Sequence, residues 1–173
     1  MPTAGDDDTL REGLAAGRED AFVAVYDRFA SRLLATAWGM LGSRADAEDA
    51  VQDVFLGLVR SRLSLGGVED LRAYLFASLR HAAIRRRRRR DDPPPAREAI
   101  EASSPGSPIA AERAARLERA LASLPPEQRE VVALKVDGGL TFAEIAAVLR
   151  TSPNTVAGRY RYAMEKMRAR LED

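Results

Sequence analysis

The chain has 173 residues, enough for one domain or for two small ones. Its 27 basic and 26 acidic residues nearly cancel, so the overall charge does not by itself indicate a nucleic-acid ligand. Cysteine is absent, which excludes disulfides and thiol catalysis, and His81 is the only histidine, which excludes paired-histidine metal sites. We expect a cytoplasmic, non-enzymatic protein with no catalytic residue, metal, cofactor or small-molecule substrate.

Apolar residues recur with a helical period along almost the whole chain, which predicts an all-α fold. Thr9 is expected to cap a short first helix that stops near Gly17. The longest uncharged apolar stretch, residues 33–41, is far shorter than the roughly 20 residues that span a bilayer, so we expect no membrane insertion. The second helix carries one stripe that should face the core: Phe22, Val25, Tyr26, Phe29, Leu33 and Ala37.

The third helix has an apolar face and an acidic face, and Ser43 is its expected N-cap. The apolar stripe consists of Ala47, Val51, Val54, Phe55 and Leu58. At 100° per residue, Asp46, Asp49 and Asp53 share the side away from that stripe. From the pattern alone, these carboxylates are most simply a solvent-exposed face. They make a poor metal site because no second group converges on them.

The fourth helix follows the Gly66-Gly67 break and runs into six consecutive arginines, residues 85–90. Its expected core positions are Val68, Leu71, Leu75, Leu79 and either Ala82 or Ala83. Arg80 lies one or two turns before the run, so the helix has a positive edge. That edge is either a solvated helix end or a track for nucleic-acid phosphates.

Residues 91–107 are rich in proline and serine and have no apolar period, which predicts a flexible linker. It divides the chain into an N-terminal helical domain, residues 1–90, and a C-terminal one, residues 108–173. Pro125-Pro126 opens the second helix of the C-terminal domain. The core positions of its first two helices are Leu117, Leu121, Leu124, Val131, Val132 and Leu134.

The last two helices have the pattern of a helix-turn-helix. Thr141 and Glu144 have capping-box spacing, and Ser152 followed by Pro153 reads as the N-cap and first residue of the final helix. The final helix would bury Val156, Tyr160, Ala163, Met167 and Leu171. It would present Thr155, Arg159 and Arg161 to a DNA major groove, although an αα-hairpin that only packs would share the pattern.

Two sets of motifs carry a resemblance to a known family. The first is the segment Asp46-Ala47-Glu48-Asp49-Ala50-Val51-Gln52-Asp53-Val54-Phe55-Leu56. The second comprises residues 124–131, residues 139–146, Asn154-Thr155-Val156 and Arg159. In this order they resemble the core-polymerase-binding segment and the promoter-reading domain of bacterial RNA polymerase sigma factors. The similarity is to the small two-domain extracytoplasmic-function (ECF) type of the sigma-70 family.

The resemblance implies a subunit that binds core RNA polymerase, directs promoter recognition and transcription initiation, and is commonly inhibited by an anti-sigma factor. It gives the acidic face a role in binding core polymerase, through Asp46, Glu48, Asp49, Gln52 and Asp53. It gives recognition of the −10 promoter element to the loop at residues 64–68 and to Arg80, His81, Arg85, Arg86, Arg87 and Arg88. It gives recognition of the −35 element to Ser152, Asn154, Thr155, Ala157, Arg159 and Arg161.

The sequence departs from the family at three places. His81 and Arg85 stand where asparagine and aspartate are common, which favours phosphate contacts over base reading. Arg150 stands at a turn position that often has glycine, so a positive φ there would be strained. Ala157-Gly158 replaces a frequent Lys-Ser, which removes one expected phosphate contact. The alternative function is a stand-alone helix-turn-helix transcriptional regulator, which would usually dimerise on paired half-sites.

Overall fold

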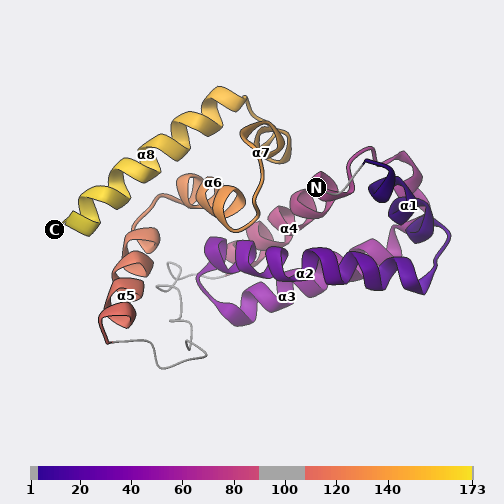
Figure 1. Ribbon diagram of the computed structural model, residues 1–173, viewed down its shortest axis with the longest axis horizontal. Coiled ribbons are helices and arrows are strands. Elements are labelled where there is room, and N and C mark those ends of the chain that lie inside the picture. Colours follow the sequence, from indigo (N-terminus) through magenta and orange to yellow (C-terminus); the bar gives the residue numbers. More distant parts are fainter. Residues whose placement is uncertain (1–3, 90–107, 173) are drawn as a thin grey trace.

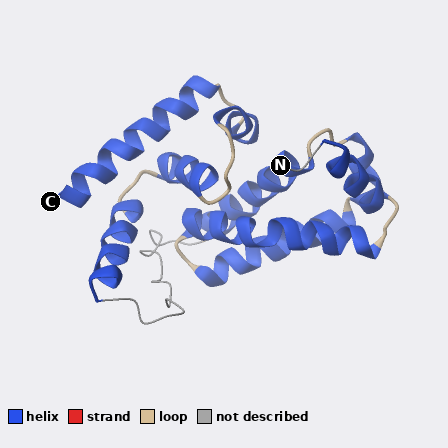
Figure 2. Ribbon diagram, viewed as in Figure 1, coloured by secondary structure: helices blue, strands red, loops and turns tan. Residues whose placement is uncertain are grey.

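The computed structural model describes residues 4–89 and 108–172. The predicted linker, residues 91–107, therefore lies outside the described residues. Throughout the described ranges the secondary structure is helical and no strand occurs, which confirms the all-α prediction (Figure 2).

The elements follow one another along the chain with short connections (Figure 1). The N-terminal half contains α1 (Ala4–Ala15), α2 (Glu19–Leu41), α3 (Arg44–Arg60), the 3₁₀ segment η1 (Arg62–Gly67) and α4 (Leu71–Arg88). The C-terminal half contains α5 (Pro108–Ala122), α6 (Pro126–Val136), α7 (Phe142–Leu149) and α8 (Pro153–Glu172). In Figure 1, α2 and α3 run side by side, and α6 lies between α2 and α8.

The apolar stripes predicted for the N-terminal helices form its core, with one exception. Val25, Leu33 and Ala37 of α2 are fully buried. They pack with buried residues of α3 and α4, among them Ala47, Val54, Leu58, Leu71, Leu75 and Leu79. Both Ala82 and Ala83 are buried. Tyr26 is the exception: its side chain is 55% exposed, so its prediction as a core residue is wrong.

Capping explains where three of the helices begin. The Ser43 hydroxyl accepts a hydrogen bond from the Asp46 amide (3.3 Å), and the Asp70 carboxylate accepts one from the Ala73 amide (2.9 Å). The capping box at the start of α7 is complete, because Thr141 and Glu144 each accept the other's backbone N–H. Thr9 does not cap a helix, since α1 already begins at Ala4.

The C-terminal half has a small core of its own beside the larger one. Ala120, Leu124, Val132, Ala163 and Met167 form it. Leu117 and Leu171 are exposed, which contradicts their prediction as core residues. The buried Arg129 donates hydrogen bonds to the carbonyls of Leu121, Ala122 and Leu124, and so satisfies the C-terminal end of α5.

The two halves also pack against each other, which the sequence did not indicate. The larger core continues from the N-terminal helices into residues of α6 and α7, including Val131, Leu134 and Ile145. α2 contacts α6, and α4 contacts α7. Gly39 permits the close approach of α2 and α6, because a Cβ atom there would lie 3.0 Å from the Ala133 Cβ. The halves are therefore in direct, well-packed contact in this structure.

Two arginines of α4 reinforce this contact between the halves. Arg72 donates hydrogen bonds to Glu144 (3.2 Å) and to the carbonyls of Gly138 (3.1 Å) and Gly139 (2.7 Å). Arg80 pairs with Glu130 of α6 at 2.8 Å. Both pairs are largely shielded from water, so solvent screens them less than it screens surface pairs.

Candidate protein- and nucleic-acid-binding surfaces

The predicted acidic face exists and lies on the outward side of α3. Glu48, Asp49, Gln52 and Asp53 are exposed, while Asp46 is half-buried at the capped end of the helix. Glu48 pairs with Arg44 at 2.9 Å on the same helix. The structure thus places all five predicted residues along one helix face, four of them accessible to a partner.

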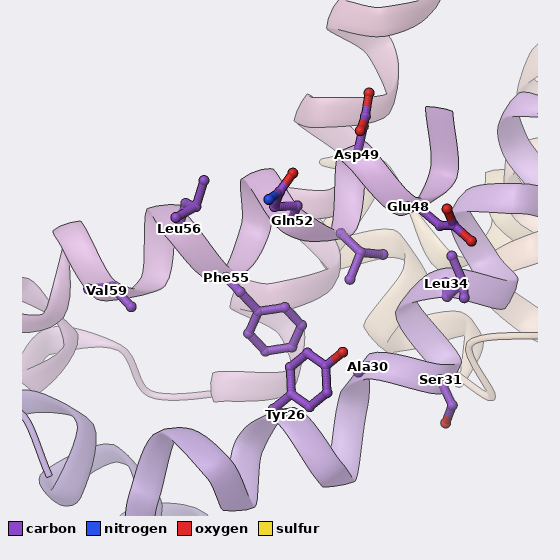
Figure 3. A pocket seen from close by; sticks show the side chains of 11 residues that line it. Tyr26, Ala30, Ser31, Leu34, Glu48, Asp49, Gln52, Phe55, Leu56 and Val59 are labelled. Carbon is purple, nitrogen blue, oxygen red and sulfur yellow. The ribbon is translucent and has the colours of Figure 1, made fainter. Parts of the chain in front are cut away.

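An apolar groove of about 740 Å³ borders this acidic face, between α2 and α3 (Figure 3). The rings of Tyr26 and Phe55 lie at its centre with 5.0 Å between their centroids, and Leu34 lines its wall. Glu48, Asp49 and Gln52 form its polar rim, as Figure 3 shows. Leu56 and Val59 extend the apolar surface and are about half exposed.

Sequence reasoning missed this groove. The signal that could have found it is the position of Tyr26, Leu56 and Val59, three large apolar residues near the edges of otherwise regular core stripes. An apolar floor with an acidic rim is suited to an amphipathic helix with basic residues on its flanks.

The predicted arginine track divides into two groups in the structure. Two members form ion pairs: Arg80 with Glu130, and Arg86 with Asp49 and Asp53. The remaining members are exposed in the last turns of α4: His81, Arg85, Arg87 and Arg88. Arg87 also acts on Arg129, whose guanidinium pKa is lowered by burial and, to a smaller extent, by the charge of Arg87. Four of the six predicted −10 residues are therefore accessible here.

A second, smaller hollow of about 200 Å³ lies between α3 and α4 beside these exposed residues. Tyr74, Ser78, His81 and Arg85 line it on the α4 side. The Tyr74 hydroxyl is hydrogen-bonded to the Ser61 hydroxyl (2.9 Å), which fixes the start of η1 against α4. In the neighbouring predicted loop, Leu65 is buried, whereas Ser64, Gly66 and Gly67 are exposed.

The helix-turn-helix forms as predicted. Arg150 ends α7 in the left-handed conformation (φ 52°, ψ 49°), so the strain expected at this non-glycine turn residue is present. The Ser152 hydroxyl accepts the Thr155 amide (3.1 Å) and caps α8. Val156 is fully buried and fixes α8 against α7.

The first turns of α8 carry the predicted −35 residues on an accessible side. Ser152, Asn154, Thr155 and Arg161 are exposed, and Ala157 and Arg159 are partly exposed. Hydroxyl, amide and guanidinium groups at the N-terminal end of an exposed helix are what major-groove contact requires. Gly158 has open space around it, with no atom within 4 Å of the position of a Cβ atom.

Within residues 4–89 and 108–172, no group of three or more histidine, cysteine, aspartate or glutamate side chains is arranged to hold a metal ion. None of the helices described in these ranges is long and apolar enough to cross a membrane. The features that stand out are surfaces for binding a protein and a nucleic acid.

Two family models match the chain, one in each half. "Sigma-70 region 2" matches residues 25–92, and "Sigma-70, region 4" matches residues 114–167. Among curated proteins, the ECF RNA polymerase sigma factor SigL of Mycobacterium tuberculosis (strain ATCC 25618 / H37Rv) is 30% identical over 167 residues, covering 93% of this chain and 94% of the relative. The RNA polymerase sigma factor CarQ of Myxococcus xanthus is 31% identical over 159 residues, covering 90% and 91%.

Two solved structures resemble the whole arrangement. CnrH, in complex with the cytosolic domain of CnrY, matches with a TM-score of 0.77 and 26% identity, covering 98% of each chain. The sigma factor RpoE, in complex with the anti-sigma factor NepR from Bartonella quintana, matches with a TM-score of 0.66 and 25% identity, covering 81% of this chain and 89% of that one. The similarity therefore extends across both halves of the chain.

Proposed function

This chain belongs to the ECF RNA polymerase sigma factors, and on that premise we propose that it binds core RNA polymerase through α3 and directs it to promoters through α4 and α8. Sigma factors are non-enzymatic initiation factors, so we propose that the chain contributes binding energy and specificity rather than catalysis. We place its action in the cytoplasm, where bacterial RNA polymerase works.

One observation carries the assignment of α3: outward-facing carboxylates lie directly beside an apolar groove. Asp49 and Gln52 belong to both features, since they stand on the acidic face and on the groove rim. A partner helix with an apolar stripe and flanking arginines or lysines would bury the exposed parts of Tyr26 and Leu56 and meet the carboxylates at the same time. We assign core binding to this combined surface.

The proposed DNA contacts lie on exposed or partly exposed residues in the last turns of α4 and the first turns of α8. Near the −10 element we propose phosphate contacts from His81, Arg85, Arg87 and Arg88, because these groups are exposed in the last turns of α4. At the −35 element we propose groove contacts from the first turns of α8, with Arg159 and Arg161 on the backbone.

Reading both elements requires the two halves to separate. The elements lie roughly 25 base pairs apart, which is about 85 Å of duplex at 3.4 Å per base pair. A compact folded chain of this length has a radius of gyration of roughly 16 Å, so its dimensions fall short of that distance. We infer that the packed arrangement is a form not engaged with a complete promoter, and that domain boundaries near residues 90 and 108 permit the opening.

We further infer that an anti-sigma factor binds this chain. The inference is supported by the match to RpoE, which was solved with the anti-sigma factor NepR, and by the accessible groove on α3. The similarity to sigma factors over nearly the whole chain leaves the stand-alone regulator without a specific observation in its favour.

The proposed core interface can be tested by titrating the labelled chain into core RNA polymerase that lacks a sigma factor and following fluorescence anisotropy. We expect saturable one-to-one binding, and a loss of at least tenfold in affinity for Asp53→Lys, since reversal puts a like charge opposite a basic partner. Glu12→Lys makes the same charge change on an exposed position of α1 and is the matched control. Equal affinities for the two variants would refute the α3 interface.

A further inference from the structure

Arg86 differs from the other arginines at the end of α4 in what it contacts. One of its terminal nitrogens donates to the Asp49 Oδ2 atom (3.1 Å) and the other to the Asp53 Oδ2 atom (2.9 Å). A single guanidinium thus joins two carboxylates that lie one helical turn apart on α3. Arg85 and Arg88, its neighbours in the run, are exposed.

The exposed fractions of Arg86, Asp49 and Asp53 show which of these side chains are accessible to a partner. The Arg86 side chain is only 19% exposed, whereas those of Asp49 and Asp53 are 59% and 41% exposed. Arg86 therefore lies beneath the carboxylates rather than over them. Each of its bonds uses an Oδ2 atom and leaves the Oδ1 atom of the same aspartate outside the pair.

Two aspartates at positions i and i+4 of a helix repel each other, and without a cation between them their side chains would turn apart. The planar guanidinium is suited to joining two carboxylates, because its N–H groups have a fixed geometry. The two side chains then lose their conformational entropy on folding and not on binding. The acidic face is presented to solvent already oriented.

We propose that Arg86 is a positioning residue for core polymerase binding: it orients Asp49 and Asp53 on α3 and does not contact promoter phosphates. The proposal rests on the assignment of α3 as the polymerase interface. It reassigns one member of the predicted −10 set from DNA to polymerase binding. It also means that neighbouring arginines of one run serve different partners.

The test compares Arg86→Gln, Arg86→Lys and the control Arg89→Gln, which removes a charge from the same run at an exposed position. Each full-length variant is titrated into core polymerase by anisotropy. Losing the orientation of these two short side chains should weaken core binding by Arg86→Gln about three- to tenfold, equivalent to about 0.7–1.4 kcal/mol. We expect Arg89→Gln to bind core polymerase as the parent does. Arg86→Lys should recover part of the loss, since an ammonium keeps the charge but cannot fork onto both carboxylates.

A second measurement separates positioning from a general effect on the fold or on DNA. In an Asp49→Asn, Asp53→Asn background, Arg86→Gln should cause no further loss of core affinity, whereas a folding defect would still add to it. The salt dependence of promoter binding by the assembled holoenzyme should stay the same for Arg86→Gln and become shallower for Arg88→Gln. An equal change of slope in both variants would make Arg86 a phosphate contact and overturn the proposal.

The remaining outcomes separate this proposal from the one on which it rests. If the double Asn variant binds core polymerase normally, the α3 interface is wrong and the role of Arg86 falls with it. If the double Asn variant binds weakly but Arg86→Gln binds normally, only the role of Arg86 is wrong. Tighter binding by Arg86→Gln would show that Arg86 competes with the polymerase for the carboxylates, which also overturns the proposal.

Discussion

Arg72 makes the most extensive polar contact described between the two halves, and replacing it by glutamine should weaken their association measurably. The side chain is 26% exposed and donates to three acceptors of the C-terminal half: Glu144, Gly138 and Gly139. Glutamine is shorter and uncharged, so it cannot reach and satisfy all three. The substitution removes the contact without adding bulk to the interface.

The expected loss follows from the number and the burial of these bonds. A hydrogen bond to a charged group contributes about 1.5–3 kcal/mol when it is well buried. Because Arg72 and Glu144 are each about a quarter exposed, water can replace part of each bond, and we expect Arg72→Gln to lower the free energy of unfolding by about 1–2 kcal/mol in total. For a chain of this size that is a fall in Tm of about 2–8 °C.

The assay is urea denaturation followed by circular dichroism, together with calorimetry. Arg85→Gln, at an exposed position of the same helix, is the control and should change the free energy of unfolding by less than about 0.5 kcal/mol. If Arg72→Gln and Arg85→Gln were equally stable, the three bonds between the halves would contribute nothing beyond what water supplies. The reasoning about the interface would then be refuted.

The pH dependence of this contact has a definite sign. Burial raises the pKa of Glu144, but hydrogen bonds from Thr141 and the charges of Arg72 and Lys135 outweigh burial, and the net pKa is lowered. Glu144 therefore stabilises the folded chain above the ordinary glutamate pKa of about 4.3, and this contribution is lost as the pH falls through the folded value. The stability difference between parent and Arg72→Gln should shrink over the same acid range. NMR titration should show a higher Glu144 pKa in the variant.

Three further substitutions test local features of the C-terminal helices and of the arginine run. Gly158→Ala should raise the free energy of unfolding by about 0.5–1 kcal/mol, because a methyl group there meets open space in the middle of α8; an unchanged Tm would contradict this. Arg150→Gly should gain about 0.5–1 kcal/mol by relieving the left-handed turn, while Arg150→Ala should not, and equal Tm values for the two would exclude the strain. The double variant Arg85→Gln, Arg88→Gln should reduce the slope of log affinity against log salt for promoter binding by up to about 2, and an unaltered slope would assign these arginines to solvent.

Helix caps and apolar stripes could be predicted from the sequence because they depend on residues a few positions apart. Ser43, the Thr141–Glu144 pair and Ser152 each cap the helix that their spacing predicts, and the core stripes of α2, α3 and α4 are buried or partly buried apart from Tyr26. The helix-turn-helix followed from the same signals. The strained turn at Arg150 was indicated by the family resemblance, because glycine is common at that turn position.

Contacts between residues far apart in the chain could not be predicted from the sequence. Arg80 contacts Glu130, 50 residues away in the sequence, and Arg86 contacts Asp53, 33 residues away. The sequence of similar arginines gave no sign that Arg80 pairs with α6, that Arg86 pairs with α3 and that the remaining arginines described in the run are exposed to solvent. Tyr26 shares the period of the α2 core stripe and yet faces the groove. The apolar period shows which side of a helix faces the core. The packing of neighbouring helices decides how many residues on that side are buried.

The size of the residue at position 39 affects the proposed equilibrium between packed and separated halves of the chain. A methyl group at this position would meet Ala133 and Asp137 only while α2 lies against α6, so its steric cost falls on the closed form alone. The gain in helix propensity from alanine, by contrast, is the same whether the halves are together or apart. With the halves opening as proposed, alanine at position 39 would therefore favour the open form, the form that is free to engage both promoter elements.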